Sequence, residues 1–106
     1  MSQKIKFTIK SKILIGTLND TETSRDFASL LPLSLKLEEY AGTEKVSYLP
    51  GKLSTKGAPS GSKPSVGDIT YYAPWGNLAI FHKDFRYSDG LIILGKLDGG
   101  VDAFKV

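Results

Sequence analysis

The alternation of apolar and polar residues along the chain predicts a protein built mostly of short strands. The clearest example lies within residues 67–82, where Ile69 and Tyr71 alternate with Thr70 and Tyr72. A period of two is typical of a strand with one buried face. A turn rich in proline and glycine follows, and a second short apolar run then predicts a paired core strand. The stretch is therefore expected to form a hairpin around which the rest of the chain is organised.

The two ends of the chain carry further strand patterns. Residues 4–18 predict two strands joined by a tight turn near Lys10. Within them, residues 13–15 (Ile-Leu-Ile) are apolar on consecutive positions, which predicts a strand that is buried on both faces or lies centrally in the sheet. Near the other end, residues 91–97 form the most apolar predicted strand of the chain.

A short helix is predicted between the first strands and the middle of the chain. Residues 19–24 supply several capping side chains, and Phe27 begins an apolar stripe at i, i+3 and i+4 that would seat the helix on the sheet. We expect the acidic side chains of Glu22 and Asp26 to complement the helix dipole in the first turn. Pro32 disfavours helical geometry in the residue before it, so we expect the helix to end there.

The region after the helix combines two strand patterns with a long polar segment. Leucines alternate with polar residues over 33–38, which predicts a strand, and residues 46–49 predict a brief second strand. Residues 50–65 are rich in glycine, proline, serine and lysine and show no period. A loop of this length is uncommon in a small domain, so it is either a binding loop or a flexible surface excursion.

The composition supports a small β-rich fold. The chain has 106 residues, of which 41% are hydrophobic and 24% charged, so we expect one soluble domain that spans residues 1–106. Eleven glycines and five prolines between short apolar runs favour strands and turns over a helical bundle. About seven or eight strands with one short helix predict a mainly β protein, a small closed or nearly closed antiparallel barrel, because closure removes exposed sheet edges.

Charge and residue types exclude several classes of function. The net charge of +3 is mild, and the lysines near the start of the chain alternate with apolar residues as a solvated strand face, so we expect no nucleic-acid partner. The chain has no cysteine and His82 is its single histidine, so we expect no metal site and no cofactor. No apolar run is long enough to span a membrane and no signal-peptide core precedes the first strand. We therefore expect a cytoplasmic protein without a membrane partner.

Motifs in three parts of the chain resemble cyclophilins. Residues 16–30 are similar to the cyclophilin start, in which a strand and a threonine-bearing turn precede a helix. Residues 94–102 (Leu-Gly-Lys-Leu-Asp-Gly-Gly-Val-Asp) are similar to the cyclophilin segment Phe-Gly-Lys-Val-x-x-Gly-Met-Asp. Between them, residues 67–69 (Gly-Asp-Ile) and 74–81 (Pro-Trp-Gly-Asn-Leu-Ala-Ile-Phe) resemble a compact bacterial and archaeal cyclophilin-like group. The resemblance covers most of the chain outside the long loop and implies a cyclophilin-type β-barrel.

The same resemblance implies that the residues of the cyclophilin reaction are not retained. Cyclophilins lower the barrier to prolyl isomerisation with an arginine that hydrogen-bonds the proline amide. Residues 48–51 resemble the segment that follows this arginine, so its position falls on Ser47, which lacks a cationic fork. Other pocket positions fall on Leu53, Ile80 and Leu91, and of the pocket only the apolar character of Leu53 and Ile80 survives. The resemblance therefore implies the scaffold without the isomerase site.

The sequence as a whole predicts a module that binds a ligand and has little or no isomerase activity. The candidate groove residues are Tyr48, Leu53, Trp75, Ile80 and Tyr87. The loop over residues 50–65 would serve as a flap, and we expect a peptide or small-molecule partner and a monomer or weak dimer. Two alternatives stay open: an atypical or weak prolyl isomerase that uses Arg86 in place of the missing arginine, and a subunit that binds a partner along an exposed strand edge.

Overall fold

Nine strands and one α-helix build the part of the chain that a computed structural model describes, residues 3–9 and 11–104. In chain order the elements are β1 (Gln3–Ile9), β2 (Lys12–Leu18), α1 (Glu22–Ala28), β3 (Glu38–Tyr40), β4 (Glu44–Tyr48), β5 (Gly61–Ser62), β6 (Asp68–Tyr72), β7 (Asn77–Phe81), β8 (Ser88–Asp89), β9 (Leu91–Leu97) and a 3₁₀ helix (Val101–Phe104). Lys10, where the sequence predicts a tight turn, lies outside the described residues.

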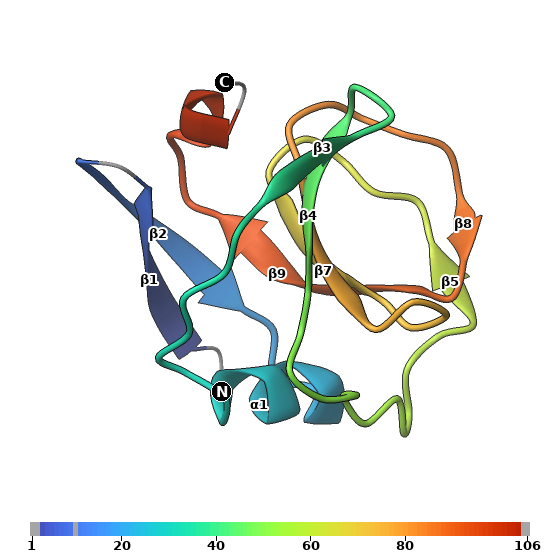
Figure 1. Cartoon of the computed structure of the whole chain (residues 1–106). Coiled ribbons are helices and arrows are strands. Elements are labelled where there is room, and N and C mark those ends of the chain that lie inside the picture. Colours follow the sequence, from blue (N-terminus) through green and yellow to red (C-terminus); the bar gives the residue numbers. More distant parts are fainter. Residues whose placement is uncertain (1–2, 10, 105–106) are drawn as a thin grey trace.

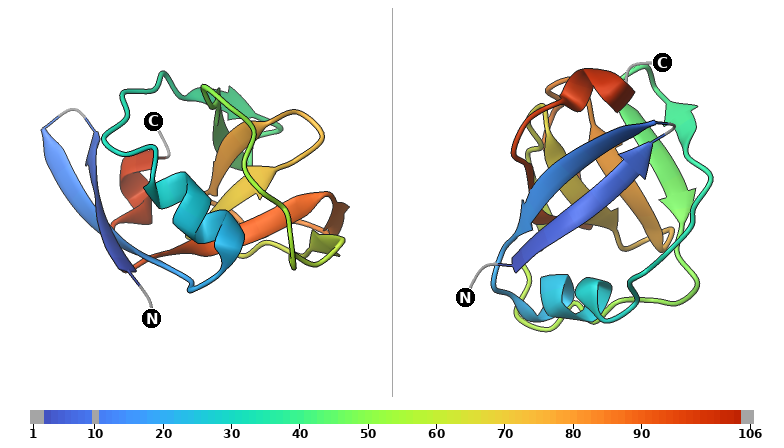
Figure 2. Two further views of the ribbon diagram at one scale, coloured as in Figure 1. Left: turned by 90° about the horizontal axis from the view of Figure 1, so that it is seen from below. Right: turned by 90° about the vertical axis from the view of Figure 1, so that its left-hand side faces the viewer.

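Seven of the strands form one antiparallel sheet in the order β1-β2-β9-β6-β7-β4-β3. The sheet curls on itself, with α1 at one end and the 3₁₀ helix near the other (Figure 1 and Figure 2). The short strands β5 and β8 pair with each other as a second sheet. Within the described residues no helix is long and apolar enough to cross a membrane. The predicted mainly β, antiparallel fold with one short α-helix is confirmed.

Apolar side chains pack on both faces of the central strands. The most deeply buried members of the main core, inside the curled sheet, are Leu18, Phe27, Ile69, Tyr71, Ile80, Leu94 and Phe104. A second apolar cluster, Ala79, Phe81 and Leu91, lies on the other face and packs against Phe85 from the segment after β7. The prediction that β6 is half-buried is therefore wrong, because Thr70 is also buried and its hydroxyl donates to the Ala79 carbonyl oxygen over 2.8 Å.

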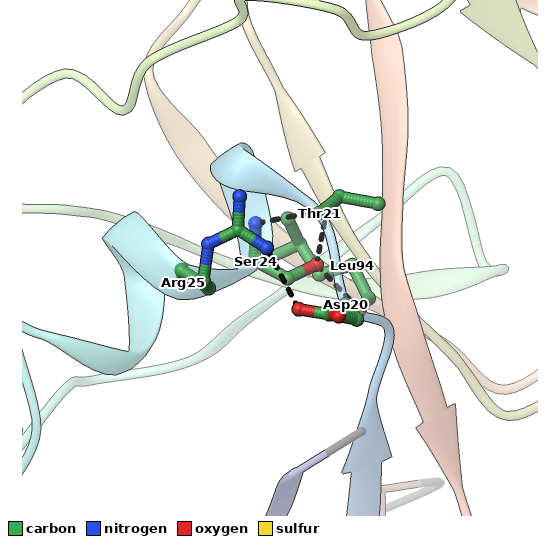
Figure 3. A network of polar contacts seen from close by, with 5 residues as sticks. All are labelled: Asp20, Thr21, Ser24, Arg25 and Leu94. Carbon is green, nitrogen blue, oxygen red and sulfur yellow. Dashed lines mark hydrogen bonds and ion pairs between the residues drawn. The ribbon is translucent and has the colours of Figure 1, made fainter. Parts of the chain in front are cut away.

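The helix α1 begins where side chains satisfy its first backbone groups (Figure 3). Thr21 is the N-cap, and its hydroxyl accepts a hydrogen bond from the Ser24 N–H over 3.2 Å. The Ser24 hydroxyl in turn donates to the carbonyl oxygen of Leu94 over 2.8 Å, which ties the helix to β9. Beside the cap, Arg25 pairs with Asp20 over 2.7 Å. The capping residues predicted for this segment are thus confirmed.

The rest of the helix differs from the prediction in two ways. It ends at Ala28, before Pro32 is reached. Glu22 lies in the first turn as predicted, but Asp26 lies beyond it, so the prediction that Asp26 complements the dipole there is wrong. The Asp26 carboxylate instead accepts a hydrogen bond from the Ser54 N–H over 2.6 Å, which holds the long loop to the helix.

Two strand predictions in the first half of the chain are also wrong. Ile13 and Ile15 are 64% and 41% exposed on the outer face of β2, so this strand is not buried on both faces. Residues 33–37 are not part of a strand, and β3 begins only at Glu38. The strands predicted over residues 46–49 and 91–97 are confirmed in substance by β4 and β9.

Candidate ligand-binding pocket

A pocket of about 410 Å³ opens on the outer face of the sheet, where β3, β4 and β7 meet the segment that follows β7. In the pairing of β4 with β7, Val46 lies opposite Ala79. Because alternate residues share a face, this register places Glu44 and Val46 on the same side of the sheet as Asn77. The lining residues that carry polar groups or aromatic rings include Tyr40, Glu44, Tyr72, Trp75, Asn77 and Arg86.

Three aromatic rings form one wall of this pocket. Trp75 lies in the tight turn between β6 and β7, where Gly76 has a positive φ of 68° that glycine adopts without strain. The indole ring meets the ring of Tyr72 edge-on at 5.3 Å between centroids, and the ring of Tyr40 at 5.7 Å. Trp75 is still 49% exposed, so the turn presents aromatic surface to solvent instead of filling the core.

Glu44 supplies a buried carboxyl group next to this wall. It lies opposite Tyr40 in the pairing of β3 with β4, and its side chain lines the pocket. Burial raises the pKa of Glu44; a 3.3 Å hydrogen bond from the Thr43 hydroxyl opposes that rise, and the negative charge of Glu39 adds to it. A positive charge bound in the pocket would favour the ionised carboxylate and so reverse the rise.

Asn77 supplies a second polar group at the other end of the pocket. The residue is buried, and its side-chain oxygen Oδ1 has no hydrogen-bond partner among the described residues. A buried acceptor without a partner costs about 1–3 kcal/mol, and because this oxygen is closed to solvent, a ligand N–H group would pair with it only if the side chain turned toward the pocket. Asn77 lies opposite Tyr48, four positions along β4 from Glu44, which corresponds to about 13 Å of strand. A ligand that meets both groups must therefore be elongated.

The segment after β7 forms the opposite rim. Phe85 stacks on Phe81 with 6.4 Å between ring centroids, which anchors the segment to the sheet. The guanidinium of Arg86 lies 4.8 Å from the centroid of the Phe85 ring. Arg86 and Tyr87 are both exposed, so this rim is the solvent-facing side of the pocket.

The structure brings together some of the residues that the sequence singles out. Trp75, Arg86 and Tyr87 all line the pocket. Tyr48 is 70% exposed and lies outside its lining, whereas Leu53 and Ile80 are buried in the main core. The five predicted groove residues therefore do not meet in one pocket around Trp75.

Strand geometry explains where Ile80 lies, and a hydrogen bond to the sheet explains where the long loop begins. Ala79 and Phe81 face the outer cluster, so Ile80 between them must face the core. In the loop, the Leu53 N–H donates to the Tyr71 hydroxyl over 3.1 Å. This hydrogen bond holds the start of the loop at the end of the curled sheet that lies next to α1. No residue of the loop over 50–65 lines the pocket, so this loop is not a flap over Trp75.

Of the polar and aromatic lining residues named above, reasoning from the sequence missed Tyr40, Glu44, Tyr72 and Asn77. The pairing of β4 with β3 and β7, and of β7 with β6, brings them together, and no local pattern reports that register. Asn77 follows Gly76 and resembles an ordinary turn residue in the sequence. The sequence held one weak signal for Glu44. It lies two positions before Val46, so in an extended strand the two side chains share a face.

The single histidine belongs to a separate polar cluster beside the pocket. His82 is buried, and its Nε2 lies 3.0 Å from Oε1 of Glu39, which is also 3.4 Å from the Lys45 ammonium. Burial acts to raise the pKa of Glu39, but the hydrogen bonds and charges of His82 and Lys45 outweigh it and lower that pKa. Among the described residues, no group of three or more His, Cys, Asp or Glu side chains could hold a metal ion.

The positions aligned with the isomerase site do not converge either. Ser47, at the arginine position, pairs with Leu78 and so lies on the core side of β4. Ile80 also faces the core, while Leu91 lines the outer pocket. Arg86 is the one arginine in the lining of the pocket, and it lies at the exposed rim.

A comparison with known proteins gives the family of the chain. The model of the cyclophilin-like family matches residues 7–106. No curated protein and no solved structure gives a match. The family match spans nearly the whole chain and agrees with its curled antiparallel sheet. The chain therefore belongs to the cyclophilin-like family.

Proposed function

We propose that this protein is a binding module whose outer pocket holds an elongated cationic group, such as a lysine or arginine side chain of a peptide or a free amine of similar length. One observation carries the proposal: the Tyr40, Tyr72 and Trp75 rings and the Glu44 carboxyl group line the same pocket. Aromatic faces attract cations, and a buried carboxylate pairs with them more strongly than an exposed one.

The two ends of the pocket suit the two ends of such a group. The ammonium or guanidinium would lie at Glu44, the aliphatic stem would pass over Val46, and an N–H group of the ligand would donate to Asn77. Because a single side chain is shorter than four strand positions, the N–H group that donates to Asn77 would belong to a neighbouring residue of the peptide. Arg86 and Asp89 both lie at the rim, so their opposite charges offset each other there.

The same arrangement argues against efficient prolyl isomerisation. That reaction needs a cationic group aimed at the proline amide, and Ser47 occupies the expected position on the wrong face of β4. Arg86 lines the pocket, which is the observation that favours a weak isomerase as the second candidate. Its exposed position over the Phe85 ring offers no fixed donor to an amide in the pocket.

A pair of matched ligands tests the binding proposal. N-acetyl-lysinamide and its neutral analogue N-acetyl-norleucinamide would be titrated while the emission of Trp75, the single tryptophan, is followed. We expect the lysine probe to bind and the norleucine probe to bind at least about tenfold more weakly, because it lacks the charge-assisted hydrogen bond. E44Q should remove this preference, whereas E38Q, at an exposed position on β3, should keep it. Equal binding of both probes would contradict the proposal.

A protease-coupled assay on a short Xaa-Pro peptide tests the second candidate. We expect the protein to leave the rate of isomerisation unchanged. Acceleration that disappears in R86A and survives in E44Q would establish the weak isomerase instead.

A further inference from the structure

The curled sheet has an open seam on the side away from the aromatic pocket. β1 and β3 are the edge strands of the seven-stranded sheet, and the chain approaches β3 through residues 33–37. An apolar groove of about 130 Å³ lies between β1 and this segment and reaches down to Phe27 and Ile80. Its sides are lined by Ile5, Phe7 and Ile9 from β1 and by Leu33, Leu35 and Leu37.

Both sides of the seam carry unpaired backbone groups. Among the described residues β1 pairs with β2 alone, and no backbone hydrogen bond joins residues 32–37 to a neighbouring segment. Lys6 and Thr8 line the groove although their side chains are on the exposed face, so they border it through their backbone. An edge strand of this kind is a template for pairing with another extended chain.

The exposed charges beside the middle of the groove are two lysines, whereas the exposed acid Glu38 lies further along the seam at the start of β3. Lys6 and Lys36 are exposed on either side of the groove, and neither has a carboxylate within ion-pair distance among the described residues. Lys4, further along β1, differs because Asp98 neutralises it at 2.7 Å. Exposed acidic groups on an added strand would therefore find two unpaired cations, whereas basic groups would be repelled.

We propose that the seam binds an extended segment of a partner protein in which apolar and acidic residues alternate. The segment adds as a strand to the free edge of β1. Its apolar side chains enter the groove between Phe7 and Leu35, and its acidic side chains lie outside, beside Lys6 and Lys36. Main-chain hydrogen bonds give the affinity of such a complex, and the alternate side chains give its specificity.

A second copy of this chain fits the same edge less well. Pairing β1 of one copy with β1 of another brings the exposed Lys6 of both strands to one face, and like charges on neighbouring strands are destabilising. The complementary partner is therefore acidic, and the chain itself carries a net charge of +3.

Four synthetic peptides test this inference on the full chain. The probe is an acetylated and amidated peptide of alternating glutamate and valine. Its controls are the lysine–valine peptide, a glutamate–serine peptide, and the probe with N-methyl groups on its valines. Amide chemical-shift changes and hydrogen-exchange protection locate the binding. We expect both effects in residues 3–9 and 31–37 with the probe, and at least about tenfold weaker binding of each control.

Protein variants separate this site from the aromatic pocket. K6E/K36E should weaken the binding of the probe about tenfold or more and favour the lysine–valine peptide, while E44Q should bind the probe as the unaltered chain does. Shift changes confined to residues of the aromatic pocket, equal binding of the lysine–valine peptide, or no binding would overturn the inference. Sedimentation that shows a dimer disrupted by K6E/K36E would assign the edge to a second copy and overturn it as well.

Discussion

Two hairpins of the same sheet differ in how deeply they are buried. β6–β7 lies at the centre, and nearly every residue of both strands is buried on one face or the other. β1–β2 lies at one edge and buries only its inner face, although β2 carries the consecutive apolar residues Ile13, Leu14 and Ile15. Apolar content therefore does not determine which hairpin becomes central.

The covering segments explain the difference. The outer face of β6–β7 is covered by the chain after β7, whose Phe85 packs on Phe81. The outer face of β1–β2 has no comparable cover among the described residues, and Ile13 is left exposed there. Each hairpin consequently offers a different surface to a partner: the covered one borders a pocket of rings and polar groups, and the uncovered one presents a backbone edge.

Truncating one isoleucine in each hairpin gives the largest expected contrast. We expect I80A to lower the free energy of unfolding by about 3 kcal/mol, because Ile80 is buried in the main core and its loss leaves a cavity. We expect I13A to change it by less than about 0.5 kcal/mol, because Ile13 is mostly exposed. Urea unfolding measures both. A loss of similar size for I13A would show that its face is covered in solution.

A matched pair of threonines tests whether the outer face of β6 is buried as well as its inner face. T70V removes a buried hydroxyl that donates to the Ala79 carbonyl oxygen, so we expect a loss of about 1 kcal/mol in the free energy of unfolding. T8V changes an exposed threonine on β1, where valine suits a strand equally well, and should have almost no effect. Thermal unfolding compares the two, and an unchanged T70V protein would contradict burial on both faces.

The positions of the central strands could be predicted from the sequence, but their burial could not. The period of two around Ile69 and the apolar run ending at Phe81 are local, and they located β6 and β7 correctly. Whether Thr70 faces solvent depends on a segment that lies beyond the hairpin in the sequence. Likewise, the leucines over 33–37 alternate as they would in a strand, but no neighbouring chain pairs with them.

The candidate site was predictable only where its residues belong to turns. Trp75 stood out because it lies between Pro74 and Gly76 in a tight turn, where large apolar residues are unusual. Glu44 and Asn77 meet the same pocket through the pairing of β4 with β7, and a shift of one residue in that register would turn them away. Register of this kind depends on contacts between distant segments, so no local pattern contains it.

The pH dependence of stability should differ between the covered and uncovered sides of the sheet. Glu44 has a folded pKa above its ordinary 4.5, so the folded chain holds its proton more tightly than the unfolded chain does. Its ionisation therefore removes stability as pH rises from 4.5 through the raised value. We expect E44Q to be more stable than the unaltered chain at neutral pH and to lose this advantage below pH 4.5. Thermal unfolding across pH measures this, with E38Q as the exposed control.

The smallest expected effect has the opposite sign and lies on the uncovered side. Hydrogen bonds from Lys4 and Thr17, each at 2.7 Å, lower the pKa of Asp98 below its ordinary 3.8, so the unfolded chain holds that proton more tightly. The carboxylate therefore adds stability above 3.8, and this contribution disappears as pH falls through the lower folded value. We expect D98N to be slightly less stable than the unaltered chain at neutral pH and to match it in stronger acid, with the difference reduced by salt because the pair is exposed. A difference that grows in acid, or that salt leaves unchanged, would mean that Asp98 is covered in solution and that the two sides of the sheet are alike.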